Sequence, residues 1–174
     1  MLSGRRHLWI CGLVLIASAA LVAGCGKKDS GEKVAEGMLE EALEQSGGEA
    51  DVDIEGSDLT MESGDVSLKS TATAEWPGDL PASVPRFAYG VPVRVTRTEQ
   101  GTEGTTYGIA LKEIQTGALD KYSADLKAAG WEVLTTMTSG EGGTIMAKKD
   151  ALALTFAYNE EEDFGNLAVM PNAD

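Results

Sequence analysis

Short segments in which apolar and polar residues alternate recur along the chain from residue 51 to residue 169. In Asp51–Glu55, for example, Val52 and Ile54 are separated by acidic residues, so a strand here would have one apolar and one acidic face. Glycine-containing turns separate these segments, which predicts antiparallel strands joined by short connections. The predicted strands cover residues 52–55, 59–61, 66–74, 91–95, 107–111, 131–137, 145–147, 152–158 and 167–169.

Two segments repeat their apolar residues with helical spacing instead. Val34 and Met38 lie four residues apart in a predicted helix, Glu32–Gln45. Leu119 and Leu126 lie on the apolar face of a second predicted helix. A helix of about fourteen residues is marginal on its own, so we expect the first one to dock on another element.

The predicted fold class is α+β. Residues 86–174 are predicted to form an antiparallel sheet with one packed helix, in the order ββαββββ. Residues 32–74 are predicted to supply an N-terminal helix and a small β-meander with an acidic outer face. Residues 75–85 contain three prolines, which favour an extended path, and we name this Pro-rich segment the strap.

The first 24 residues have the three parts of a secretory signal. Arg5 and Arg6 give a positive start, residues 8–20 are mostly apolar, and small residues precede Cys25. The apolar run is too short for a stable membrane span. Residues 1–24 are therefore predicted to be removed, and residues 25–31 are predicted to form a polar tether.

The segment Leu21–Cys25 resembles the lipobox of bacterial lipoproteins. In that family the cysteine sulfur receives diacylglycerol, and the cysteine becomes the N-terminus of the mature protein. The resemblance implies membrane attachment through Cys25 and processing by the lipoprotein maturation machinery. It implies a lipid-anchored, extracytoplasmic protein of the cell envelope, on the periplasmic face of the outer membrane if the cell has two membranes, or on the outer face of the plasma membrane if it has one. Arg5-Arg6 also resembles a twin-arginine export signal, although the strongly apolar run favours export of an unfolded chain.

Removal of the signal would also remove His7 and Cys11. The remaining chain has no histidine and no free thiol, which excludes Ser-His-Asp and Cys-His catalysis, ordinary zinc sites, and haem or iron–sulfur ligation. We therefore expect no cofactor. The full chain has 28 acidic residues against 14 Lys and Arg, a formal charge of −14. This balance argues against nucleic-acid binding, because phosphate binding needs a basic surface.

Asp51, Asp53 and Glu55, followed by Gly56 and later by Glu62, have the spacing of a calcium-binding loop. Calcium needs several oxygen ligands around one point, and this spacing can supply them. No helical pattern follows Glu62, however, and the strand alternation sends the carboxylates along one face of a hairpin. The sequence therefore favours a solvated acidic hairpin over a metal site.

Two further groups of residues are candidates for function. Trp76, Phe87 and Tyr89 lie in or next to the strap and could form a recognition groove, although packing of the strap against the sheet is the favoured interpretation. Paired carboxylates can hydrolyse glycosides without histidine, and Glu160–Asp163 offers adjacent acids. Its position between two predicted strands favours a solvated turn.

The layout of the mature chain is similar to that of a set of uncharacterised small bacterial envelope lipoproteins. The similar parts are the acidic helix, the hairpin Asp51–Gly56, the pair Trp76-Pro77, and the run from Leu80-Pro81 to Val84-Pro85. The resemblance implies no activity. We expect a non-enzymatic binding or scaffolding module with a protein partner in the envelope. The alternatives are a small carboxylate-dependent hydrolase and a weak calcium-binding module.

Overall fold

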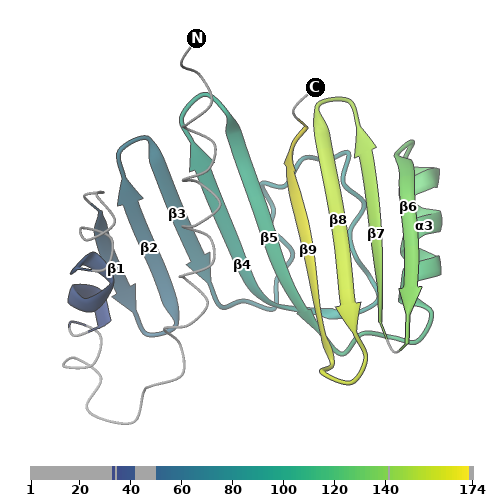
Figure 1. Ribbon diagram of the computed structural model, residues 1–174, viewed down its shortest axis with the longest axis horizontal. Coiled ribbons are helices and arrows are strands. Elements are labelled where there is room, and N and C mark those ends of the chain that lie inside the picture. Colours follow the sequence, from purple (N-terminus) through teal and green to yellow (C-terminus); the bar gives the residue numbers. More distant parts are fainter. Residues whose placement is uncertain (1–32, 34, 42–49, 141, 173–174) are drawn as a thin grey trace.

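The computed structural model describes residues 33, 35–41, 50–140 and 142–172. Nine strands of this part form one antiparallel sheet, which Figure 1 shows face on. One helix, α3 (Ala118–Ala128), lies against the sheet, and a second helical segment includes residues 35–41. The strands are β1 (Asp51–Glu55), β2 (Asp58–Ser63), β3 (Val66–Thr71), β4 (Val91–Gln100), β5 (Gly104–Lys112), β6 (Glu132–Ser139), β7 (Gly142–Lys149), β8 (Leu152–Asn159) and β9 (Phe164–Pro171).

The order of the strands across the sheet is β1-β2-β3-β4-β5-β9-β8-β7-β6. The first five strands follow one another, and the chain then passes through α3 to the opposite edge of the sheet. From β6 it returns by tight hairpins until β9 pairs with β5, with Ile109 opposite Leu167. The last strand therefore closes the gap between two meanders, and β1 and β6 are left as the two edge strands.

The predicted α+β class is wrong, because strands dominate the structure. Of the described residues 52% are in strands and 15% in helices, and the chain has a single nine-stranded sheet instead of a ββαββββ unit preceded by a separate meander. The reason is the pairing of β3 with β4, which runs from Val66 opposite Gln100 to Thr71 opposite Val95. Alternation predicts that a segment is a strand, but it does not specify which strand completes its hydrogen bonds.

The main core lies on one face of β5–β9. Ile109, Leu167, Phe156 and Ile145 form a row across four paired strands, and each is fully buried. The helix α3 packs over β6 and β7 and buries Tyr122 in the same cluster. Burial of side chains of this size contributes about 1.5–3 kcal/mol each, so this row is a main source of stability.

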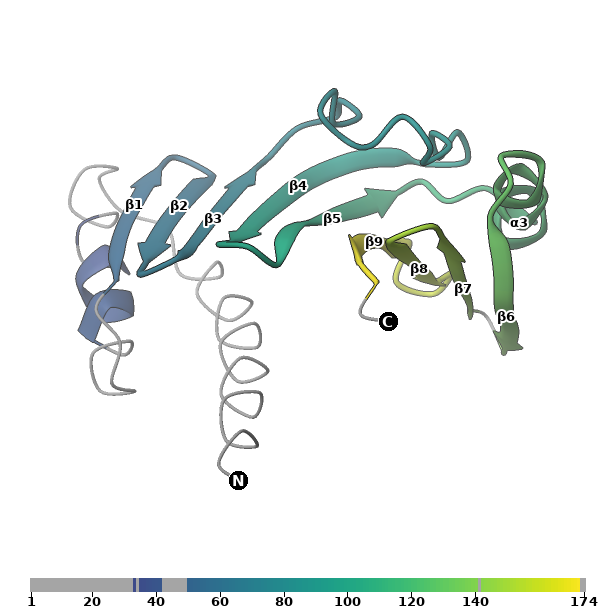
Figure 2. The same cartoon turned by 90° about the horizontal axis from the view of Figure 1, so that it is seen from above.

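The strap connects β3 to β4 and lies over the same face of the sheet as α3, as Figure 2 shows. Leu80 and Val84 of the strap are buried in the core. Three aromatic donors also bind its backbone carbonyls. The pairs are Trp131 Nε1 with Ser83 O at 2.8 Å, Tyr122 Oη with Pro85 O at 3.1 Å and Tyr107 Oη with Asp79 O at 3.1 Å. These bonds satisfy carbonyl groups that the strap does not pair with a neighbouring strand.

The first three strands bury the opposite face of the sheet. Val52 is buried, and the register places it in one row with Met61 and Leu68, on the side away from the main core. The helical segment that includes residues 35–41 lies on this side, next to β1, whereas α3 lies on the other side at the far edge (Figure 2). The apolar face of the sheet thus changes sides between β3 and β5.

Candidate binding surface on the open sheet face

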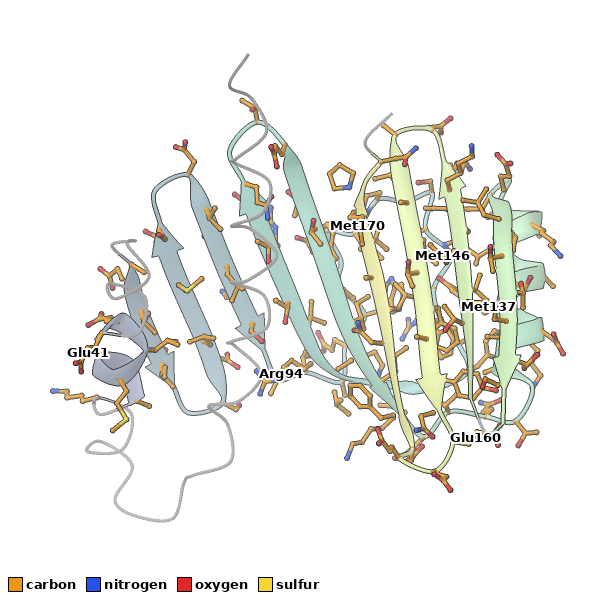
Figure 3. All side chains as sticks on the ribbon, viewed as in Figure 1. Glu41, Arg94, Met137, Met146, Glu160 and Met170 are labelled. Atoms are coloured by element: carbon orange, nitrogen blue, oxygen red, sulfur yellow. The ribbon has the colours of Figure 1, made fainter. Side chains whose placement is uncertain are left out.

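One side of β5–β9 is left without a covering element in the described part of the chain. We define the open face as the side chains of β5, β7, β8 and β9 that alternate with the core residues, together with Thr135 and Met137 of β6. Directly paired residues project from the same side of a sheet, so the register alone assigns them. Figure 3 looks onto this side and labels Met137, Met146 and Met170.

Large apolar side chains are exposed on the open face. Met137 is 54% exposed, Met146 is 43% exposed and Phe164 is 40% exposed. Alanine and threonine occupy the positions between them, such as Ala157 and Thr155 of β8. Met137 and Met146 lie on adjacent strands, and Phe164 lies two strands further across the same face. Exposed apolar residues on one face are typical of an interaction surface. Methionine suits such a surface, because its flexible thioether adapts to the shape of a partner.

Acidic residues are nearly missing from these five strands. Glu132 is the single acid in β5–β9, although the chain has 28 Asp and Glu. Its Oε2 lies 3.4 Å from Nζ of Lys148, the residue directly opposite it. The open face is therefore neutral to slightly basic on a strongly acidic protein. A protein whose charge serves only solubility would be expected to spread its acids over this face as well.

Arg94 of β4 forms the border of the open face on the side of the first three strands (Figure 3). Its Nη1 donates hydrogen bonds to Ser57 O at 3.0 Å and to Ser70 Oγ at 3.1 Å. Ser70 is buried and also receives a bond from Thr96 Oγ1 at 3.2 Å. Arg94 thus ties the turn between β1 and β2 to the centre of the sheet.

The three aromatic residues singled out in the sequence lie on the other side of the sheet. Phe87 is 2% exposed, and its ring centroid lies 5.0 Å from that of Tyr122 and 4.7 Å from that of Phe156. Trp76 and Tyr89 are half-buried against the same core. The side chain of Phe87 therefore contributes to packing and is not accessible to a ligand in this structure.

Tyr89 links the end of the strap region to α3. Its hydroxyl donates a 2.6 Å hydrogen bond to Asp125 Oδ2, and Lys121 Nζ lies 5.5 Å from the centre of its ring. The hydrogen bond to Asp125 raises the pKa of Tyr89 above its ordinary value, and burial and the charge of Asp125 act in the same direction. Tyr89 is thereby held as a protonated donor to the helix.

The acidic residues considered as calcium ligands lie along a hairpin. Asp51, Asp53 and Glu55 are exposed on one side of β1, and Glu62 lies opposite Asp51 on β2. Residues two apart on a strand are about 7 Å apart, so their carboxylates do not converge on one point. Among the described residues, no group of three or more His, Cys, Asp or Glu side chains is placed to hold a metal ion.

The acids considered for hydrolysis, Glu160–Asp163, lie in the exposed turn between β8 and β9. Asp163 Oδ1 accepts a 3.3 Å hydrogen bond from the backbone N–H of Ile114. This bond gives Asp163 a structural partner at the turn. Cys25, the predicted lipidation site, lies outside the described residues.

Burial raises the pKa of the Tyr122 hydroxyl well above its ordinary value of 10.0, and the charge of Asp125 adds to this effect. The folded protein therefore holds a proton that the unfolded chain releases at lower pH. The resulting contribution to stability is complete below about pH 10 and is lost as the pH rises further.

We expect Tyr122→Phe to cost about 0.5–1.5 kcal/mol at neutral pH, because the hydrogen bond to Pro85 O is lost. The variant should lose less stability than the wild type above about pH 10, since it has no hydroxyl to ionise at this position. Urea unfolding of both proteins across this pH range measures the difference. A constant difference between the two proteins at every pH would contradict the expectation.

The sequence alone does not indicate that the residues of the open face form a site. One feature of the sequence that indicates an apolar outer face is Met146. It lies between the core residues Ile145 and Ala147 and makes β7 apolar on both sides. A second signal was Phe164, an aromatic residue directly after an acidic turn. Neither signal was sufficient alone, because the surface assembles from strands that are far apart in the chain.

Comparisons with known proteins provide no relative for this chain. No protein-family model, no curated protein and no solved structure matches it. In the part of the chain described by the structure, no helix is both long enough and apolar enough to cross a membrane. Any functional conclusion therefore depends on the residues themselves.

Proposed function

We propose that the protein is a lipid-anchored, extracytoplasmic protein of the bacterial cell envelope that binds another protein through the open face and catalyses no reaction. The anchor is inferred from the lipobox-like segment Leu21–Cys25. The binding role is inferred from the open face. The observation that carries it is the exposure of Met137, Met146 and Phe164 on a nearly acid-free side of an acidic protein.

The size and shape of the open face fit a protein partner. Five strands about 4.8 Å apart and about eight residues long cover roughly 600 Å². A stable protein interface buries about 800 Å² on each partner, so this face supplies most of one. Small residues at its centre, among them Gly108, Ala110 and Ala168, leave a low surface that suits a broad contact.

The anchor and the open face would act together. Each acyl CH₂ buried in a bilayer contributes about 0.8 kcal/mol, so two or more chains hold a protein stably at the membrane. Confinement to one membrane surface raises the effective concentration of the protein near other envelope proteins. A face of moderate area can then hold a partner that it would bind weakly in solution.

A pair of matched charge insertions tests this proposal. Met146→Lys places a cation in the middle of the open face, whereas Ala124→Lys places one at an exposed position of α3 on the other side. We expect Met146→Lys to reduce the amount of co-purified envelope protein at least about tenfold, because an unpaired charge would be buried in the contact. Ala124→Lys should leave it unchanged.

The measurement is affinity purification of the full chain from detergent-solubilised envelopes after crosslinking in intact cells, with quantification by mass spectrometry. A partner that depends on Met146 and not on Ala124 supports binding through the open face. Equal recovery of the same proteins with both variants would contradict it.

A further inference from the structure

The two edge strands, β1 and β6, differ in whether their outward-pointing backbone groups are hydrogen-bonded. At β1 the backbone N–H of Ile54 donates to Glu36 Oε1 at 2.9 Å, and that of Val52 donates to Glu40 Oε1 at 3.3 Å. In the register with β2, these two N–H groups point away from the sheet. Carboxylates from the neighbouring helical segment thus occupy the donors that another strand would need, and this edge is closed.

The edge strand β6 has no such cover among the described residues. Ser139 lies directly opposite Gly142, only three positions further along the chain, and such a pair exchanges both of its backbone hydrogen bonds. By alternation, Met137 and Thr135 also exchange hydrogen bonds with β7. The backbone groups of Thr136 and Thr138 therefore point outward. No side chain or backbone group in the described ranges bonds to them.

The composition of β6 makes the open edge a template for pairing. After Glu132 the strand has seven residues without a charge, four of which are valine or threonine. Leu134 and Met137 are 52% and 54% exposed. Natural proteins protect edge strands with lysine, proline, inward-pointing charges or bulges. In β6 the only such protective feature is an irregularity of the register between Val133 and Thr135.

We propose that β6 pairs with β6 of a second copy of this chain, antiparallel and centred on Thr136, to join the two sheets. A two-fold axis perpendicular to the sheet places Thr136 opposite its own copy, because its backbone groups point outward. The same register places Thr135 opposite Met137 and Glu132 opposite Gly140. No charged residue then lies opposite another charged residue, so the pairing avoids the repulsion that the acidic remainder of the chain would cause.

The arrangement of the open face supports a second copy as the occupant. Met137 of β6 and Met146 of β7 lie on the open face directly beside this edge. Pairing of two copies would bring both sets of methionines next to one another and make one continuous apolar surface. The closed acidic edges at β1 would then lie at the two outer ends of the joined sheet, where they stop further strand addition.

A charge-swap experiment with the full chain tests the pairing. Two copies with different affinity tags are expressed together, and the first tag is used to purify the second. Each copy is wild type, Thr136→Lys or Thr136→Asp. Thr102, an exposed threonine in the turn between β4 and β5, carries the same substitutions as a control.

We expect the wild-type copies to co-purify. Two copies that both carry Thr136→Lys, or both carry Thr136→Asp, should lose at least about nine tenths of this recovery, because like charges face each other at the axis. A Thr136→Lys copy expressed with a Thr136→Asp copy should recover it, which also shows that both variants fold. The Thr102 variants should behave as the wild type does.

Failure of the wild-type copies to co-purify would overturn the proposal. Two further results would overturn it: co-purification at the wild-type level of two Thr136→Lys copies, or no co-purification of a Thr136→Lys copy with a Thr136→Asp copy. Either result would show that Thr136 does not face its own copy. The readout involves two copies of this chain alone, so it does not depend on whether the open face binds an envelope partner.

Discussion

Replacement of Cys25 by alanine should leave the precursor without lipid and uncleaved before residue 25. If the segment Leu21–Cys25 directs lipidation, the variant has no sulfur to receive diacylglycerol and is not cleaved before residue 25. The acyl chains supply the anchoring energy at about 0.8 kcal/mol per buried CH₂, so partitioning into the detergent phase should fall. The retained apolar run of residues 8–20 is too short to replace the lipid as a stable anchor. Triton X-114 partitioning and gel mobility of the precursor measure both effects.

Cys11 provides the matched control for this substitution. It is the other cysteine of the chain, and it lies inside the apolar run of the predicted signal. Cys11→Ala should leave partitioning and processing as they are in the wild type. Unchanged partitioning and mobility of the Cys25→Ala variant would contradict lipid anchoring at this residue.

Replacement of Phe87 by alanine should lower the free energy of unfolding by about 3–5 kcal/mol. The ring is 2% exposed and touches the rings of Tyr89, Tyr122 and Phe156, which come from the strap region, α3 and β8. Its removal leaves a cavity where these elements meet, and we expect the strap to pack less tightly against the sheet. Urea unfolding followed by tryptophan fluorescence measures the loss, because Trp131 is buried below the strap.

Phe164 allows the same substitution to be made on the open face. It is 40% exposed, so Phe164→Ala should change the free energy of unfolding by less than about 1 kcal/mol. The contrast separates a packing residue from a residue that is free to contact a partner. Similar losses from Phe87→Ala and Phe164→Ala would show that the two faces of the sheet do not differ as described.

Local structure could be predicted from the sequence where one face of a segment is apolar. Val52 and Ile54 alternate with acids, and the structure has β1 at Asp51–Glu55. The stripe that contains Leu119 and Leu126 likewise lies within α3. The start of α3 cannot be predicted from a capping residue, because the residue before the helix is Gly117, with φ of 76°, and no side chain caps it. A backbone that needs left-handed glycine leaves no capping side chain to detect.

The sheet as a whole could not be predicted from alternation. Each strand has two edges, and a period of two is the same whichever neighbour it pairs with. The pairing of Val66–Thr71 with β4 across the strap decides that the chain forms one sheet. This contact depends on the path of the strap, which three aromatic donors fix from β5, α3 and the residue before β6. Interactions of this kind connect residues up to 48 positions apart and leave no local pattern.

The candidate surface was hidden for a related reason. Trp76, Phe87 and Tyr89 are candidates for a groove because large aromatic residues lie close to prolines in the sequence. The open face consists mostly of alanine, threonine and methionine, which look ordinary in each strand by itself. These residues form one surface only after β5 pairs with β9. The folded structure also shows that nearly all acidic residues lie outside β5–β9.

The most direct test of binding through the open face is site-specific photo-crosslinking in intact cells. A photoreactive amino acid replaces Met146 in one version of the full chain and Ala124 of α3 in another. We expect a discrete crosslinked product with another envelope protein from position 146 and none from position 124. No product from position 146, or the same products from both positions, would contradict binding through the open face.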